Sequence, residues 1–126
     1  RGALEDAGLS PDAVDFISAH ATATKMGDVI EANAIHRVFG EQSPRVAGLK
    51  SYMGHTMGSC GVIETILTLY MMQEGFLAPT LNLEQIDKRC GHIRHVPEVL
   101  DHRVRVAGIQ NFAFGGVNTC LLLRRL

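Results

Sequence analysis

The most informative segment of the sequence for the fold is Lys50-Ser51-Tyr52-Met53-Gly54-His55-Thr56-Met57-Gly58-Ser59-Cys60-Gly61. It places a lysine and a histidine five positions apart among glycines and small residues, and it runs directly into a long apolar segment. This pattern predicts a strand end, a tight loop and a helix start, with Gly54 and Gly58 letting the backbone turn or approach a ligand closely. Ser59 is expected to cap the helix. Loops of this kind carry the ligand sites of open α/β sheets.

The segments on either side of this loop alternate between strand and helix. Short apolar runs predict strands over residues 14–18, 44–49, 104–109 and 117–123. Apolar residues at helical spacing predict helices over residues 28–39 and 60–74, with a further short turn of helix over 84–89. The last two strands are close enough to pair as a hairpin. The alternation predicts an α/β domain with a mixed sheet.

The composition is that of an ordinary globular domain. The chain has 126 residues, of which 46% are hydrophobic and 20% charged, and its net charge is -1, which predicts one domain. No basic stripe is present, so nucleic acid is not an expected partner. The apolar run over residues 62–72 is too short to span a membrane. The cysteines lack metal-type spacing, which indicates free thiols in a reducing, cytosolic setting: Cys60, Cys90 and Cys120.

Two histidines occupy matching positions at the ends of predicted strands. His20 follows the first strand and His55 follows the second. If these strands are parallel neighbours, both loops lie at the same sheet edge, and the imidazoles are expected to meet there. Two unrelated loop histidines, or a weak zinc site, are the alternatives; no metal ligand set is predicted. The other histidines lack a matching context and are expected at the surface: His36, His92, His95 and His102.

Two acidic residues at the start of the first long helix have two interpretations. Asp28 followed three positions later by Glu31 is a capping arrangement that the helix dipole favours. Alternatively, Glu31 faces the site and pairs with Lys50. A lysine at the end of a strand is expected to be buried, and a buried lysine needs a carboxylate partner, for which Glu31 is the candidate.

The remaining candidates are hydroxyl, aromatic and thiol groups. Thr22 and Thr24 either satisfy their own loop or hydrogen-bond the amides of an extended ligand. Cys60 lies near a helix N-terminus, where a thiolate is stabilised, although packing between helices is the preferred interpretation. Two phenylalanines at the hairpin turn either fill its core or form a mobile aromatic beside a pocket, hinged at the turn glycines: Phe112, Phe114, Gly115 and Gly116.

Taken together, these patterns resemble the β-ketoacyl-acyl-carrier-protein synthases. Residues 20–31 resemble the family's His-Gly-Thr-Gly-Thr … Gly-Asp-x-x-Glu motif, and residues 50–61 resemble its Lys-x-x-x-Gly-His-x-x-x-Ala-Ala-Gly motif. Residues 112–118 are similar to its Phe-Gly-Phe-Gly-Gly-Thr-Asn hairpin. Residues 75–82 are similar to the connection of the synthase I branch. The resemblance covers essentially all of residues 1–126.

The resemblance implies a thiolase-like layered α/β fold, of which this chain is most of the C-terminal half. It implies a decarboxylating Claisen condensation between an acyl thioester and malonyl-acyl-carrier-protein, in fatty acid or polyketide biosynthesis. No cofactor is expected, because the substrates are carried on the phosphopantetheine of acyl carrier protein. Acyl carrier protein, the N-terminal half of the synthase and a second copy of the full-length parent are the expected partners.

The resemblance also implies roles for particular residues. Two histidines assist decarboxylation and condensation, with both imidazole N–H groups expected to donate to the enolate oxygen; these are His20 and His55. Lys50 matches the family lysine and Glu31 its carboxylate partner. Thr22 and Thr24 match the threonines that contact the phosphopantetheine arm. Phe114 matches the gating aromatic, with Phe112 beside it. The residues expected to shape the site are Asp28, Gly54, Gly115 and Gly116.

This sequence departs from the family pattern at several positions. Ala21 and Ala23 replace glycines beside the thioester arm, and Val117 replaces a threonine. The family's acyl-accepting cysteine belongs to the N-terminal half, so the isolated chain is not expected to catalyse condensation. A non-catalytic chain-length-factor-like partner or a degenerate relative is the alternative. A thiolase is less favoured, because it would carry Gly-His-Pro, whereas Thr56 follows His55 here.

Overall fold

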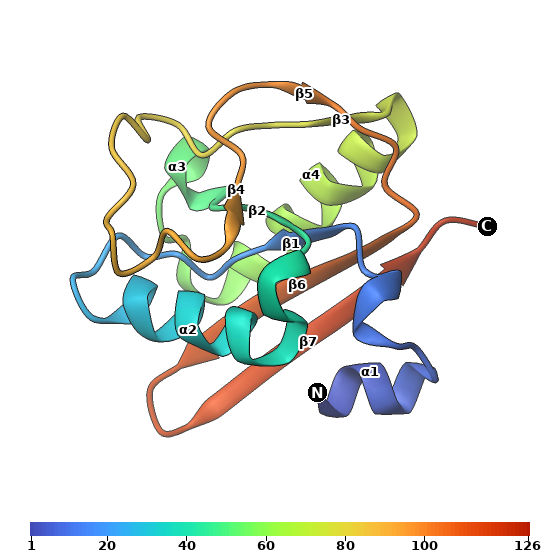
Figure 1. Ribbon diagram of the computed structural model, residues 1–126, viewed down its shortest axis with the longest axis horizontal. Helices are drawn as coiled ribbons and strands as arrows, with labels where there is room; N and C mark the ends of the chain where they lie inside the picture. Colours follow the sequence, from blue (N-terminus) through green and yellow to red (C-terminus); the bar gives the residue numbers. More distant parts are fainter.

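A five-stranded mixed sheet organises the structure, a computed structural model that describes residues 1–126 (Figure 1). Its strand order is β4-β2-β1-β6-β7. The strand β1 pairs in parallel with both β2 and β6, while β6 and β7 form an antiparallel hairpin. The strands are β1 (Phe16–Ser18), β2 (Arg45–Ala47), β4 (Arg94–His95), β6 (Val106–Ala113) and β7 (Val117–Arg124). The predicted mixed α/β sheet and the hairpin are therefore confirmed.

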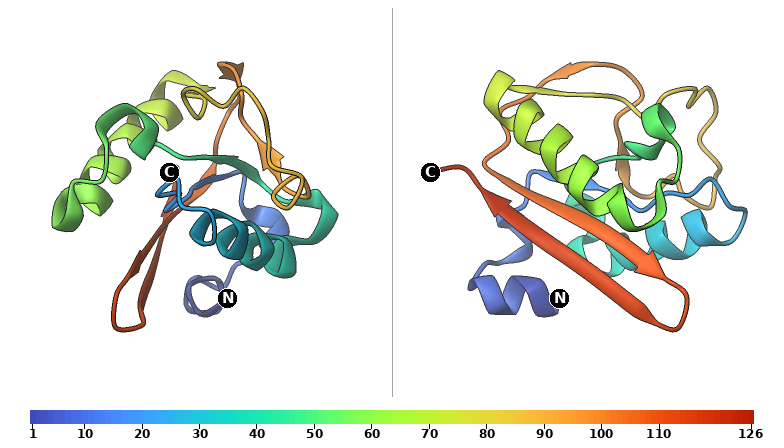
Figure 2. Two further views of the ribbon diagram at one scale, coloured as in Figure 1. Left: turned by 90° about the vertical axis from the view of Figure 1, so that its left-hand side faces the viewer. Right: turned by 180° about the vertical axis from the view of Figure 1, so that it is seen from behind.

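Helices cover both faces of this sheet, as Figure 2 shows. One face carries α2 (Gly27–Phe39) and α1 (Gly2–Ala7), and the other carries α4 (Cys60–Glu74). The remaining elements are short: the helix α3 (Lys50–Met53), the two-stranded sheet of β3 (Phe76–Leu77) and β5 (Leu100–Asp101), and the 3-10 turns η1 (Pro11–Ala13), η2 (Gly40–Gln42) and η3 (Met57–Ser59).

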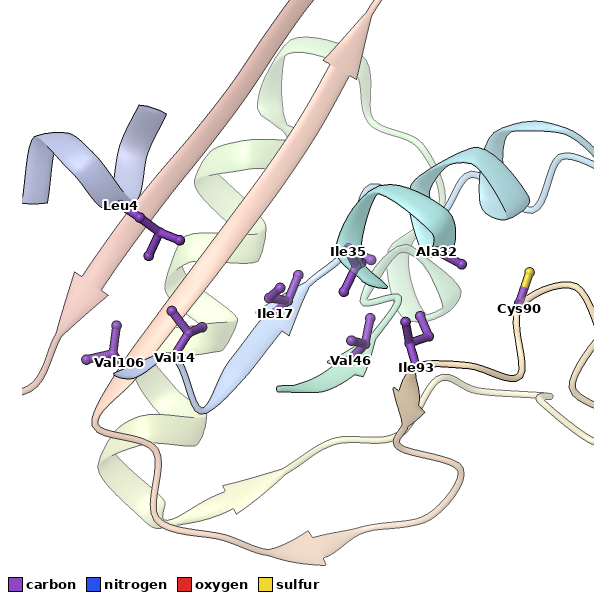
Figure 3. Packing of buried hydrophobic residues seen from close by; sticks show 10 residues of the cluster. Leu4, Val14, Ile17, Ala32, Ile35, Val46, Cys90, Ile93 and Val106 are labelled. Carbon is purple, nitrogen blue, oxygen red and sulfur yellow. The ribbon is translucent and has the colours of Figure 1, made fainter. Parts of the chain in front are cut away.

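Two hydrophobic clusters fill the space between sheet and helices. Ala32 and Ile35 of α2 pack on Ile17 and Val46 of the central strands, with Cys90 and Ile93 closing the cluster from the loop before β4 (Figure 3). On the opposite face, Met71 and Met72 from the C-terminal end of α4 lie in a second cluster. They share it with Phe16, Ala47 and Ala107 of the three central strands. The sheet is therefore a buried central layer, with its parallel strand ends aligned at one edge.

Three local predictions were wrong. Lys50 does not lie in an open loop: it begins the one-turn helix α3. Residues 84–89 form turns and bends rather than a helix. Ser59 does not cap α4, because its hydroxyl donates to the backbone oxygen of Thr56 instead, at 2.9 Å. For Ser59, the hydrogen bond within its own loop competes with the capping position.

The outward face of α4 is apolar and uncovered. Val62, Ile66 and Tyr70 are each more than half exposed, although this helix is the most hydrophobic in the chain. Exposed apolar patches of this kind drive association between molecules.

We expect a protein limited to residues 1–126 to self-associate through this face. The double variant Ile66→Glu/Leu69→Lys places opposite charges on it and should shift the population toward monomer in size-exclusion chromatography with light scattering. Glu41→Lys, which changes an exposed residue elsewhere, is the control and should leave association unchanged. A wild-type chain that stays monomeric at high concentration and binds no hydrophobic dye would contradict the prediction.

Candidate active site

The two histidines predicted to meet do so at the aligned strand ends. His20 follows β1, and His55 lies beyond β2 and α3. Their ring centroids are 5.5 Å apart, with the planes at 88°. Phe112 of β6 packs edge-on to His20 at 5.6 Å. The pair lies at the surface rather than in a closed cavity, because His55 is exposed and His20 is half-buried.

The hydrogen bonds of His55 determine where its proton lies. The backbone N–H of Met57 donates to Nδ1 at 3.0 Å. A ring nitrogen that accepts cannot carry the proton of the neutral imidazole, so that proton is on Nε2. Neutral His55 is therefore a hydrogen-bond donor at Nε2.

His20 has the opposite arrangement. Its Nδ1 lies 3.3 Å from Oδ1 of Asn111, and an amide oxygen can only accept, so Nδ1 carries the proton and Nε2 keeps its lone pair. Burial lowers the pKa of His20 below its ordinary value, and the positive charge of Lys50 lowers it further. The neutral pair thus offers one donor and one acceptor, in place of the two donors predicted.

A buried ion pair is linked to His20 through Asn111. Lys50 Nζ donates to Glu64 Oε1 at 2.5 Å, and the two side chains are 4% and 0% exposed. Asn111 links this pair to His20: its Nδ2 donates to Glu64 Oε2 at 2.8 Å, while its Oδ1 accepts from Lys50 at 3.4 Å. The site therefore contains a continuous network of four side chains, drawn from the β1 loop, α3, α4 and β6.

The predicted pairing of Lys50 with Glu31 was wrong. The expectation that Lys50 is buried against a carboxylate is confirmed, but the partner is Glu64 of α4. Glu64 lies within the apolar run over residues 62–72, and neither it nor Asn111 was predicted at the site. The available signal was that a carboxylate inside the most hydrophobic helix needs a buried cation.

Glu31 holds the His20 loop instead. Its two carboxylate oxygens accept the backbone N–H groups of His20 and Ala21, both at 2.8 Å. Burial raises the pKa of Glu31, while these two hydrogen bonds oppose the rise. Glu31 thus fixes the backbone on which the His20 ring is mounted, and it neither caps α2 nor pairs with Lys50.

The N-terminus of α2 is capped from the threonine loop. The hydroxyl of Thr24 accepts the N–H of Gly27 at 3.1 Å and lies 3.4 Å from the hydroxyl of Thr22. Asp28 Oδ1 accepts the N–H of Thr24 at 3.3 Å. Thr24 therefore takes the place of the predicted Asp28–Glu31 capping arrangement. Of the two interpretations of the threonines, the hydrogen bonds support the one in which they satisfy their own loop.

The other predicted positions lie around the rim. Phe114 is fully exposed at the tip of the β6–β7 hairpin. The glycines at this tip have φ of 86° and 82°, as a tight hairpin connection requires; they are Gly115 and Gly116. Gly54 ends α3 with φ of 71°, which turns the chain toward His55.

The histidine loop contains backbone strain that the family's glycines would avoid. Ala21 and Ala23 have φ of 36° and 58°, in the left-handed region that is unfavourable for residues with a Cβ atom by roughly 1–2 kcal/mol. Ala23 is exposed, whereas the Ala21 methyl group packs closely against Gly48. Substitution of Ala23 therefore tests the effect of backbone strain on stability without removing a buried contact.

We expect Ala23→Gly to raise the free energy of unfolding by about 0.5 to 1 kcal/mol, because the relieved strain exceeds the added entropy of the unfolded chain. Urea denaturation followed by circular dichroism measures this. Ala34→Gly makes the same chemical change in the exposed interior of α2 and should destabilise by about 1 kcal/mol. If both substitutions destabilise equally, the strain assigned to Ala23 is not present.

The remaining four histidines were expected at the surface, and each keeps part of its side chain exposed there. All four are half-buried: the rings of His36 and His92 stack edge-on with centroids 4.9 Å apart, and His95 Nε2 lies 2.8 Å from the backbone oxygen of Cys90. His102 makes no side-chain hydrogen bond. No group of three or more histidine, cysteine, aspartate or glutamate side chains is arranged to hold a metal ion.

Comparisons with known proteins identify the family of this chain. Residues 1–84 match the family described as "Beta-ketoacyl synthase, C-terminal domain". The chain is 38% identical over 113 residues to 3-oxoacyl-[acyl-carrier-protein] synthase 1 of Escherichia coli (strain K12), covering 90% of this chain and 28% of that protein. The chain therefore spans less than a third of the length of this curated relative.

Solved structures share the fold of this chain. A β-ketoacyl synthase from Burkholderia phymatum STM815 superposes with a TM-score of 0.93 at 43% identity, over 98% of this chain and 30% of that one. A type II polyketide ketosynthase, solved with its acyl-carrier protein and bound to the hexaketide, superposes with a TM-score of 0.93 at 29% identity, over 99% of this chain and 31% of its own. The predicted thiolase-like fold is thus confirmed. No helix in the chain has the length and apolar character needed to cross a membrane.

Proposed function

The chain belongs to the β-ketoacyl synthase family and corresponds to the C-terminal domain of these enzymes, and we propose that the full-length protein condenses an acyl thioester with malonyl-acyl-carrier-protein. The observation that carries the proposal is the histidine pair, with ring centroids 5.5 Å apart, mounted on a buried ion-pair network. His20 and His55 act on the substrate, whereas Lys50, Glu64 and Asn111 position His20.

His55 has the chemistry that decarboxylation requires. When the bond from the malonyl carbon to its carboxylate breaks, carbon dioxide leaves and the electron pair moves to the thioester oxygen as an enolate. The Nε2–H of His55 is a preorganised donor for that oxygen. The enolate carbon then attacks the acyl thioester, forming the new carbon–carbon bond as the acyl carbon–sulfur bond breaks.

His20 supplies the complementary group. Its Nε2 lone pair can accept the proton that the acyl-accepting thiol gives up when that thiol attacks the incoming thioester. The proton can then pass to the departing carrier thiol. The lowered pKa of His20 favours the neutral ring that this step needs at neutral pH. The thiol itself is assigned to the remainder of the parent protein.

Acyl carrier protein is the proposed macromolecular partner, and the phosphopantetheine arm is proposed to pass Thr22 and Thr24. The ketosynthase that this chain resembles was solved in complex with its acyl-carrier protein. Phe114, exposed on a glycine hairpin, is the proposed gate. A homodimeric parent and a cytosolic location stay predictions.

The test is condensation by the full-length parent protein. Incubated with acyl- and malonyl-acyl-carrier-protein, it should produce 3-oxoacyl-carrier-protein, detected by intact-mass spectrometry, together with carbon dioxide. A protein limited to residues 1–126 should produce neither condensed product nor acyl-enzyme. Carbon dioxide release without chain extension would instead support a chain-length-factor-like role, and no reaction with any acyl chain length would overturn the proposal.

A further inference from the structure

A buried cysteine lies beside the Nδ1 edge of the His55 ring. Cys60 is the first residue of α4 and only 1% exposed. Its Sγ lies 3.5 Å from Nδ1 of His55, and the hydroxyl of Thr56 donates to the same sulfur at 3.4 Å. The motif that this segment resembles carries alanine at this position, so the helix start does not itself require a thiol.

The partners of the sulfur determine the direction of its hydrogen bond. Thr56 donates its hydroxyl proton to Sγ, which leaves the thiol hydrogen of Cys60 free to point elsewhere. Nδ1 of His55 already accepts from the backbone N–H of Met57 and is therefore unprotonated. Sγ lies 3.5 Å from this unprotonated nitrogen, so the thiol S–H donates to the lone pair that also accepts the Met57 N–H, as the longer of two shared hydrogen bonds. Thr56, Cys60 and His55 thus form a short chain of donors that ends on Nδ1.

We propose that Cys60 is a positioning residue for His55: together with the Met57 N–H, its thiol holds the ring orientation and keeps the imidazole proton on Nε2. The inference deepens the proposed function, on which its kinetic part rests. Cys60 acts through the imidazole and is not a nucleophile, because its sulfur is buried on the Nδ1 side of the ring, away from the donor nitrogen. The other cysteines have no such contact: Cys90 packs in the core beside α2, and Cys120 lies exposed on β7.

The test compares Cys60→Ala, which removes the donor, with Cys60→Ser, which keeps one. In the full-length protein, Cys60→Ala should lower kcat about 3- to 10-fold with KM unchanged, as expected for the loss of one modest hydrogen bond. Cys60→Ser should retain most of the activity. Thr56→Val, which removes the hydroxyl that orients the thiol, should show a smaller loss in kcat. Cys120→Ala is the matched control and should leave kcat unchanged.

A spectroscopic measurement separates this inference from the proposed function. In the ¹⁵N NMR spectrum of the full-length protein labelled at histidine, the Nδ1 signal of His55 should move downfield in Cys60→Ala and remain near its wild-type position in Cys60→Ser. This result stands even if no condensation is detected. An unchanged Nδ1 signal in a folded Cys60→Ala protein would overturn the inference. Equal kcat for Cys60→Ala and wild type in an active enzyme would overturn it too.

Discussion

We expect Glu64→Ala to lower the free energy of unfolding by about 3 to 5 kcal/mol, the largest stability effect of any single substitution considered for this chain. Glu64 is fully buried, and its carboxylate accepts hydrogen bonds from Lys50 and Asn111. Removing it leaves the Lys50 ammonium buried without a counter-charge, in a region where water cannot replace the lost partner. Urea denaturation followed by circular dichroism measures the change.

Two further variants distinguish the loss of the ion pair from a general destabilisation of α4. Glu74→Ala removes an exposed carboxylate at the end of the same helix and should change the unfolding free energy by less than about 0.5 kcal/mol. Lys50→Met/Glu64→Leu removes both charges and should recover much of the stability lost in Glu64→Ala, because no uncompensated charge remains. If the double variant is no more stable than Glu64→Ala, desolvation of Lys50 is not the cause.

The largest expected effect on activity is that of His55→Ala. We expect kcat of the full-length protein to fall about 10²- to 10³-fold, because the variant lacks the preorganised Nε2–H donor at the developing enolate oxygen. KM for malonyl-acyl-carrier-protein should change little, since the hydrogen bond strengthens as charge develops. Steady-state assays of 3-oxoacyl product at saturating acyl donor measure both parameters.

The controls for this substitution address folding and charge. His55 is exposed, so His55→Ala should unfold at nearly the wild-type urea concentration, unlike Glu64→Ala. His102→Ala removes a half-buried imidazole near β5 and should leave kcat unchanged. A His55→Ala enzyme with wild-type kcat for condensation would remove His55 from the mechanism, and the proposed oxyanion donor with it.

The two long helices, the three central strands and the hairpin partner were predictable from the sequence alone, whereas α3 and the edge strand β4 were not. Apolar periodicity over α2 and α4, with a glycine after each helix, marked both helices to within one residue. The two histidines were predictable because each follows a buried strand, and parallel strands of one sheet end at a common edge. The spacing of a glycine pair between two apolar runs was enough to predict the hairpin.

Which polar groups meet could be established only from the packing of the elements. Glu31 was the predicted partner of Lys50, but its carboxylate accepts two backbone N–H groups of the His20 loop. Glu64 reaches Lys50 because α4 crosses the opposite face of the sheet, and Asn111 joins them from β6. The protonation pattern of the histidine pair follows from the same contacts. Periodicity records which side of an element faces the core, whereas hydrogen-bond partners depend on how separate elements pack in three dimensions.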